Sequence, residues 1–353
     1  MKCLINNIKI QAIATYLPTN ILEMTSLNVL YSEKYVNMVM NATGVNRVHV
    51  ADEKQTASDM CFEAANMLLE KEKINKDEID GLVFVSQTAD YRAPATSIIL
   101  QDRLGLSKET VCFDISYGCS GYIYGIFQAA TLIGSGACSN VLVLAGDTTT
   151  KLINSKDRSQ RMVFGDCGSA TLVCKGEDQI GFHICSDGSQ FEKVIIPAGG
   201  FRIPSSEETR KEFVDSEENI RTQENLYMDG SAVFNFIIKY GQESINALLQ
   251  YIKWDKDEVN FYALHQATRF TLSYLRKRLK LDNEKAPINI SNYGNTGPTT
   301  IPLVITDLGY IGSGVETNKW EKVIMSAYGV GLSWGSVACN LSQTNIYKPI
   351  NKI

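Results

Sequence analysis

The chain has 353 residues, of which 44% are hydrophobic and 21% are charged, and its formal net charge is −5. A chain of this length can form two domains or one duplicated domain with a large core, and its acidic balance gives no support to a nucleic-acid-binding role. Nine cysteines occur without C-x-x-C pairs, which predicts reduced thiols, no metal site and a cytoplasmic location.

The predicted elements begin with an alternating pattern over 5–14. This pattern is typical of a strand and lacks the long apolar run of a signal peptide or a membrane span. Further strands are predicted over 81–87, 111–116, 140–146, 168–175, 180–186, 191–196, 260–264, 287–291, 322–327 and 332–340. Helices are predicted over 57–72, 95–104, 120–135, 230–251, 268–279 and 299–311. Strands that alternate with helices predict mostly parallel sheets covered by helices.

A charged segment, residues 201–223, interrupts this alternation and has little apolar periodicity. We expect a surface excursion, and the alternative is a flap over a site.

The chain also repeats itself. NKDEID (75–80) and DKDEVN (255–260) both precede a predicted strand and lie 180 positions apart, from 75 to 255. YGCSG (117–121) and YGNTG (293–297) lie 176 positions apart, from 117 to 293, which sets Cys119 opposite Asn295. We therefore expect an internally duplicated α/β fold with halves 1–187 and 188–353.

The cysteine in YGCSGY (117–122) lies between the predicted strand 111–116 and an apolar helix. Glycines on both sides of Cys119 allow other groups to approach closely. A helix N-terminus offers free N–H groups and partial positive charge, which favour the thiolate. Cys119 is therefore a candidate nucleophile, and the alternative is a small buried core cysteine.

A histidine and an asparagine stand in comparable positions in the second half. His265 follows the apolar run FYAL, at the carboxyl end of a predicted strand, where open α/β sheets place ligands. A lone histidine there is more often structural, and His49 and His183 lack even this context. Asn295, however, lies on a glycine-flanked turn that mirrors the cysteine turn. The three side chains predict a thiolate nucleophile with two donors for one oxygen.

Six stretches occur in the order typical of one enzyme family: TGVNR (43–47), DISYGCSGY (114–122), FGDCGSATLV (164–173), HQAT (265–268), NYGNTGPTTIP (292–302) and AYGVGLSWGS (327–336). On these stretches the sequence resembles the β-ketoacyl-acyl carrier protein synthase III enzymes of the thiolase superfamily. The resemblance implies an internally duplicated thiolase-like α/β fold, layered α-β-α-β-α with two mixed sheets around buried helices. It also implies a homodimer, an acyl carrier protein as partner and no cofactor.

The resemblance assigns catalysis to Cys119, His265 and Asn295. Cys119 takes an acyl group from a thioester, while the backbone amides of Cys119 and Val330 hold the oxyanion. A malonyl thioester then loses carbon dioxide, and His265 and Asn295 hold the enolate that attacks the acyl-cysteine to give a β-ketoacyl product. The alternatives are an acyltransferase of the same fold that moves the acyl group to a hydroxyl or amine without decarboxylation, an inactive scaffold, and a cysteine hydrolase of another fold.

Several positions depart from the family pattern. Met38, Ala42, Thr268 and Phe270 stand where relatives use aromatic, cationic and amide groups to hold the nucleotide of coenzyme A. Carrier-protein thioesters are therefore expected to be the better donors. Arg158 and Arg269 are the basic residues expected at the rim of the substrate tunnel.

Two further positions are expected to contact the acyl group or its carrier. Ala93 stands where relatives have a bulky residue that reaches across the dimer to close the partner's acyl site. This predicts a deeper site, unless Tyr91 or Tyr122 fills the space. Tyr328, in the AYGVG turn, is the second of these positions.

Overall fold

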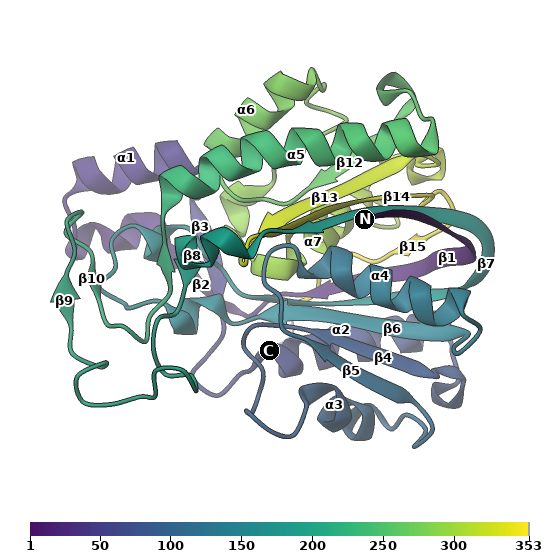
Figure 1. Ribbon diagram of the computed structural model, residues 1–353, viewed down its shortest axis with the longest axis horizontal. Coiled ribbons are helices and arrows are strands. Elements are labelled where there is room, and N and C mark those ends of the chain that lie inside the picture. The colour runs from purple at the N-terminus through teal and green to yellow at the C-terminus, as the bar shows by residue number, and fades with distance from the viewer. Residues whose placement is uncertain (352–353) are drawn as a thin grey trace.

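Nine strands of this computed structural model, which describes residues 1–351, join in one mixed sheet (Figure 1), and the other described strands form two-stranded pairs. One half of the sheet runs through β5 (Val111–Ile115), β4 (Gly81–Val85), β6 (Asn140–Asp147) and β7 (Cys167–Ser186). The other continues from β7 through β14 (Ser333–Cys339) and β13 (Val323–Gly329) to β12 (Phe261–Leu264). Strand β4 is parallel to both neighbours and β12 is parallel to β13, whereas β6, β7, β14 and β13 pair antiparallel. The predicted mixed α/β class is confirmed.

The two expected sheets are joined through β7. Residues 167–174 of this strand pair with β6, and residues 181–186 pair with β14. Strand β1 (Lys2–Tyr16) runs antiparallel beside β7 over its length, and β15 (Asn345–Ile346) pairs with β1. The sequence predicted two strands here, 168–175 and 180–186. The polar stretch between them lies at a bulge in one continuous strand, where the pairing with β1 passes from Ile8–Lys175 to Asn6–Gln179.

Helices form three layers around the two halves of the sheet (Figure 1). Helices α4 (Gly121–Gly134) and α7 (Thr300–Gly309) lie in the central core, which also contains side chains from both sheet halves. Helices α2 (Ala57–Glu72) and α3 (Thr96–Leu104) cover β4 and β6 from outside, and α5 (Gly230–Ile252) and α6 (Arg269–Leu279) cover the β13–β14 side. The predicted α-β-α-β-α layering is confirmed, and the apolar character of α4 follows from its burial between the halves.

Some smaller elements differ from the prediction. Helix α1 (Glu33–Thr43) was not predicted; Ser32 caps it by accepting the N–H of Tyr35. The predicted strand 287–291 is wrong. Ile290–Asn292 form a 3-10 turn, because Ile290 is buried in a side cluster instead of pairing in the sheet. Of the strand predicted over 191–196, only β8 (Val194–Ile195) is present. Two further strands that were not predicted, β2 (Asn20–Glu23) and β3 (Arg47–Val50), pair with each other.

The charged segment 201–223 lies on the surface, as predicted. It contains the short hairpin β9 (Phe213–Val214) and β10 (Ile220–Arg221), and it is followed by β11 (Tyr227–Met228), which pairs with β8. Arg221 is buried and bonded to Asp157 at 2.5 Å and to Asp215 at 2.8 Å. The pair with Asp157 attaches the segment to the main fold, and the pair with Asp215 joins two residues within the segment.

The division into halves 1–187 and 188–353 stays a prediction, because strands from both ranges belong to one sheet. None of the helices described within residues 1–351 has the length and apolar character needed to cross a lipid bilayer.

Candidate active site

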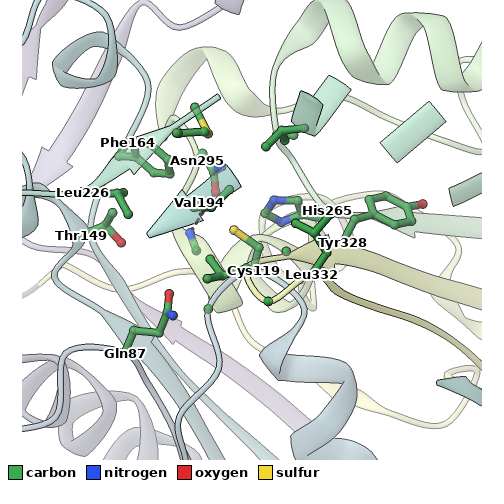
Figure 2. Close-up of a pocket in the computed structure, with 18 of the residues that line it drawn as sticks. Gln87, Cys119, Thr149, Phe164, Val194, Leu226, His265, Asn295, Tyr328 and Leu332 are labelled. Carbon is green, nitrogen blue, oxygen red and sulfur yellow. Dashed lines mark hydrogen bonds between the residues drawn. The ribbon is translucent and has the colours of Figure 1, made fainter. Parts of the chain in front are cut away.

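A cavity of about 430 Å³ lies where β4, β5, β6, β12 and β13 end. Parallel strands of an α/β fold place their carboxyl ends at one edge, and ligands bind there. Cys119, His265 and Asn295 all line this cavity. Figure 2 shows their side chains pointing into the same space, with Thr149, Leu226, Phe164 and Val194 on one side and Tyr328 and Leu332 on the other.

Cys119 lies in the turn between β5 and α4. The turn is closed by the N–H of Gly121, which donates to the carbonyl of Gly118 at 2.7 Å. Gly329, the last residue of β13, presses against this turn: a Cβ at position 329 would lie 2.9 Å from the Cβ of Cys119. Only glycine permits this approach, which brings the second half of the chain onto the nucleophile.

The Cys119 thiol is partly exposed to the cavity and otherwise enclosed by protein. Burial, followed by the charge of Asp147, raises the pKa of the thiol to about 12, while its own N–H and the Asn295 amide oppose the rise. At neutral pH the side chain is therefore a thiol. The expectation that the helix N-terminus alone favours a thiolate is wrong for the resting protein, because desolvation outweighs it.

His265 follows β12 and is 1% exposed. Its backbone N–H donates to the carbonyl of Ser326 at 2.9 Å, and its Nδ1 lies 2.6 Å from the hydroxyl of Thr300 at the start of α7. Burial lowers the pKa of His265 to about 3, so the ring is neutral at physiological pH. With Nδ1 engaged, Nε2 is the nitrogen left for the cavity.

The Asn295 side chain is fixed by its own turn. Its Oδ1 accepts the N–H of Gly297 at 3.0 Å, and its backbone N–H donates to the carbonyl of Val163 at 2.8 Å. Because the amide oxygen is occupied, the NH₂ group is the end that faces the cavity, where it acts as a hydrogen-bond donor toward Cys119.

The two backbone N–H groups predicted to hold an oxyanion belong to Cys119 and Val330. Val330 follows Gly329 and lines the cavity. A Cβ at position 329 would lie 3.3 Å from the nitrogen of Cys119, so the two turns lie against each other. Within residues 1–351, neither the N–H of Cys119 nor that of Val330 donates to a backbone carbonyl. Both are available to a developing oxyanion.

Asp147, at the end of β6, is a buried carboxylate that the sequence analysis missed. Its Oδ1 accepts four hydrogen bonds, at 2.8 to 3.1 Å, from Ser86, Gln87 and Thr88. Its Oδ2 accepts none from residues 1–351. Burial raises the pKa of this carboxyl from near 3.8 to about 6. A carboxylate at the carboxyl end of a predicted strand is the signal that could have identified it.

Thr300 is the second residue that sequence reasoning missed. It lies inside the quoted stretch NYGNTGPTTIP, but nothing in the sequence shows that its hydroxyl contacts His265.

Two of the predicted binding residues line the cavity. Thr268 does so at the start of α6, where its hydroxyl accepts the N–H of Thr271 at 3.1 Å, and Tyr328 does so from β13. Phe270 lies outside the cavity wall and is 61% exposed, with its ring 5.2 Å from that of Phe234. Ala93 is exposed and also lies outside the wall.

The two predicted rim arginines lie outside the wall as well. Arg269 is exposed and donates to the carbonyl of Gly44 at 3.1 Å. Arg158 pairs with Glu218 at 2.5 Å and lies over the ring of Tyr35. The acidic surface segment thus neutralises Arg158, and a role for either arginine in substrate binding stays a prediction.

Asp147→Asn tests the buried charge. Between about pH 4 and pH 6 the folded protein holds a proton that the unfolded chain has released, so the free energy of unfolding falls by about 3 kcal/mol as pH rises through this range. The amide keeps the oxygen that accepts all four hydrogen bonds. We expect the variant to lose this pH dependence and to be more stable than the parent at pH 7.5, measured by urea unfolding at fixed protein concentration.

The exposed Asp282→Asn is the matched control and should leave the pH dependence in place. An Asp147→Asn variant that is less stable than the parent at pH 7.5 contradicts the assignment.

Comparisons with known proteins agree with this geometry. The model of 3-oxoacyl-[acyl-carrier-protein (ACP)] synthase III matches residues 113–188, and the model of its C-terminal part matches residues 249–341. The β-ketoacyl-[acyl-carrier-protein] synthase III of Caldanaerobacter subterraneus subsp. tengcongensis is 32% identical over 91% of this chain and 94% of its own length. That of Chlamydia caviae is 30% identical over 94% of this chain and 96% of its own.

A solved structure of this family also resembles this chain in fold and sequence. The crystal structure of 3-oxoacyl-(acyl-carrier protein) synthase from Burkholderia xenovorans superposes with a TM-score of 0.91 at 33% identity, covering 100% of this chain and 99% of that one. The predicted thiolase-like fold is thereby confirmed. The chain belongs to the 3-oxoacyl-[acyl-carrier-protein] synthase III family.

Proposed function

We propose that this protein loads an acyl group onto Cys119 and condenses it with a malonyl thioester, releasing carbon dioxide and a β-ketoacyl thioester. The observation that carries the proposal is the convergence of Cys119, His265 and Asn295 on one cavity with two free N–H groups beside the thiol. The reacting groups are the thioester and the malonyl carboxylate, so we propose that the reaction needs no metal or cofactor.

The loading step requires removal of a proton, because the resting Cys119 is a thiol. His265 is neutral, so its Nε2 can accept that proton as the sulfur attacks the thioester carbonyl. The N–H groups of Cys119 and Val330 hold the oxygen that becomes negative. The proton then goes to the sulfur of the departing carrier, which leaves as a free thiol.

The condensation step uses the same ring with its proton on Nε2. Loss of carbon dioxide from the malonyl thioester leaves an enolate, and its oxygen accepts hydrogen bonds from His265 Nε2 and from the Asn295 NH₂ group. The enolate carbon attacks the acyl carbonyl on Cys119. The new carbon–carbon bond forms as the bond between the acyl carbon and the Cys119 sulfur breaks. The released thiolate takes a proton from solvent, which restores the resting thiol.

The two steps need opposite tautomers of His265, and Thr300 accommodates both. Its hydroxyl can accept from Nδ1–H while it donates to the carbonyl of Gly297, 3.3 Å away, which leaves Nε2 bare as a base. It can also turn its proton onto Nδ1, which places the ring proton on Nε2 as a donor. Thr300 is therefore a positioning residue for His265.

The acyltransferase alternative is less well supported than condensation. Transfer to a hydroxyl or amine needs a base, which His265 supplies alone. The Asn295 amide is held with its NH₂ group toward the cavity. A second donor in that place serves an enolate oxygen and has no role in simple acyl transfer.

We propose acyl carrier protein as the partner that delivers the thioesters, in line with the printed names of the relatives. Exposed basic residues on α6, Lys277 and Arg278, lie on the helix whose first turn lines the cavity and suit an acidic carrier. A cytoplasmic location is also a proposal, supported by nine cysteines that are all free thiols.

We further propose a homodimer formed through β5. This strand is at the edge of the sheet and exposes Val111 (38%) and Phe113 (37%), and an open apolar edge readily pairs with another chain. Phe113→Glu should give a monomer by sedimentation velocity, because a buried charge opposes pairing. Phe201→Glu, on the surface segment, is the control and should stay dimeric. A monomeric parent protein at micromolar concentration contradicts the proposal.

The proposed roles of Cys119, His265 and Asn295 can be tested by single substitutions. Cys119→Ala should abolish acyl loading, measured by intact mass after incubation with acyl thioesters of carrier protein and of coenzyme A at matched concentration. His265→Ala and Asn295→Ala should lose condensation by at least about a hundredfold, since each removes a donor to the enolate. Asn295→Ala should keep most of the loading.

In this test the carrier-protein thioester is expected to load faster than the coenzyme A thioester. Acyl mass on another cysteine, or equal loss of both steps in Asn295→Ala, argues for a different site or for the acyltransferase alternative.

Thr300→Val removes the hydroxyl and keeps the shape. We expect condensation to slow by about tenfold or more, since His265 Nδ1 loses its only described side-chain partner, and Thr300→Ser to restore it. Measurement of kcat and KM separately distinguishes positioning from misfolding, because KM and the thermal midpoint should stay close to those of the parent. A valine variant with unchanged kcat refutes the role of Thr300.

A further inference from the structure

The cavity wall contains two oxygens that the proposed mechanism does not use. They belong to Asp147 and Thr149, two residues with little exposed surface (2% and 6%) that line the same cavity as Cys119. Among residues 1–351, neither Asp147 Oδ2 nor the Thr149 hydroxyl has a hydrogen-bond partner, and neither atom is fully enclosed by protein. Both oxygens can therefore be reached from the cavity, and a bound ligand can complete their hydrogen bonds.

The two oxygens lie near each other beside Gly297. A Cβ built at position 297 would lie 3.1 Å from Asp147 Oδ2 and 3.6 Å from the Thr149 hydroxyl, and Gly297 itself lines the cavity. A side chain at position 297 would crowd both oxygens, whereas glycine leaves them open to the cavity. We define the polar niche by Asp147, Thr149 and Gly297.

The remaining wall on this side is largely apolar. Phe164, Leu226 and Val194 lie with Thr149 on one side of Cys119 (Figure 2), and Gln87 is a further polar residue of the wall. An acyl chain bound there would meet mostly hydrocarbon. A few polar groups in such a site fix the orientation and identity of a ligand.

We infer that the acyl group loaded onto Cys119 carries a hydroxyl, which donates to Asp147 Oδ2 and accepts from the Thr149 hydroxyl. This inference rests on the proposed function and names its substrate class. A hydroxyl matches the two oxygens one for one. An ammonium has three N–H groups and would leave one without an acceptor in the niche.

The niche lies on the acyl side of the site. Asp147 ends β6, and β6 lies in the half of the molecule opposite α5 and α6 (Figure 1). The first turn of α6, with Thr268 and Thr271, lines the cavity from that other side, on the helix that carries the exposed basic residues proposed to meet the carrier. Cys119 and the niche line the same cavity, so an acyl group on Cys119 can extend toward the niche.

The test compares acyl groups on one carrier protein. Hexanoyl, 2-hydroxyhexanoyl, 3-hydroxyhexanoyl and 4-hydroxyhexanoyl thioesters, with the matching amino-substituted chains, are offered to the intact protein, and the rate of mass gain on Cys119 is measured. One of the hydroxyhexanoyl groups should load at least about tenfold faster than hexanoyl, since a site built to bond a hydroxyl discriminates against the chain that lacks it.

Two variants locate the preference. Thr149→Val keeps the shape and removes the hydroxyl, and Asp147→Asn places an amide donor where the acceptor was. Both should reduce the ratio of hydroxyhexanoyl to hexanoyl loading to near one. Thr131→Val, an exposed threonine on α4, is the matched control and should keep the ratio of the parent. Should Asp147→Asn fail to fold, Thr149→Val alone decides the question.

The outcomes are distinct. Hexanoyl loading as fast as every hydroxyhexanoyl group, a faster amino-substituted chain, or a ratio that survives in Thr149→Val overturns the inference and leaves the proposed function standing. Absence of loading by every thioester overturns the proposed function itself.

Discussion

The site depends on one close contact between the two halves of the chain. The end of β13 reaches the Cys119 turn only because residue 329 has no side chain, and this contact brings the turn that carries Val330 against the cysteine turn. The other elements hold this contact in place. Helices α4 and α7 begin at the cavity and run back through the central core, so the cysteine turn and the Thr300 hydroxyl are each attached to a buried helix. A small shift of either sheet half would separate the nucleophile from its donors.

The nucleophile Cys119 and its neighbour His265 are both uncharged before a substrate binds. Burial keeps Cys119 as a thiol and His265 as a neutral ring, and the wall described by residues 1–351 contains no lysine or arginine. Negative charge that develops on an oxyanion or enolate is therefore met by N–H groups alone. Such donors are already oriented, since Asn295 is tied by Gly297 and His265 by Thr300. Preoriented dipoles in a site of low polarity stabilise charge without reorganisation.

Local patterns in the sequence predicted most of this architecture. All six helices expected from periodicity are present with ends within about two residues, because their apolar faces are long and regular. Cys119, His265 and Asn295 could be found because each follows a recognisable strand or glycine turn. Asp147 follows a predicted strand and could have been located, but its bonds to residues 86–88 could not be foreseen, since they join segments about 60 residues apart. The role of Thr300 could not be foreseen either, because it arises from a contact 35 residues away, to His265. The pairing of Arg158 was also hidden, since its partner Glu218 belongs to a surface segment whose position no local pattern reveals.

The sharing of β7 has a consequence for how such a chain can change. The strand contributes hydrogen bonds to β6 through its first residues and to β14 through its last, and β1 follows it along both. Neither half could be exchanged, expressed as a fragment or recombined with a homologue at residue 187. A cut there would leave β14 with an unpaired edge. The other piece would keep all of β7, including the residues that normally pair with β14. The sequence still shows the repeated motifs of the two halves. Because the halves share β7, however, neither can change at this strand independently of the other.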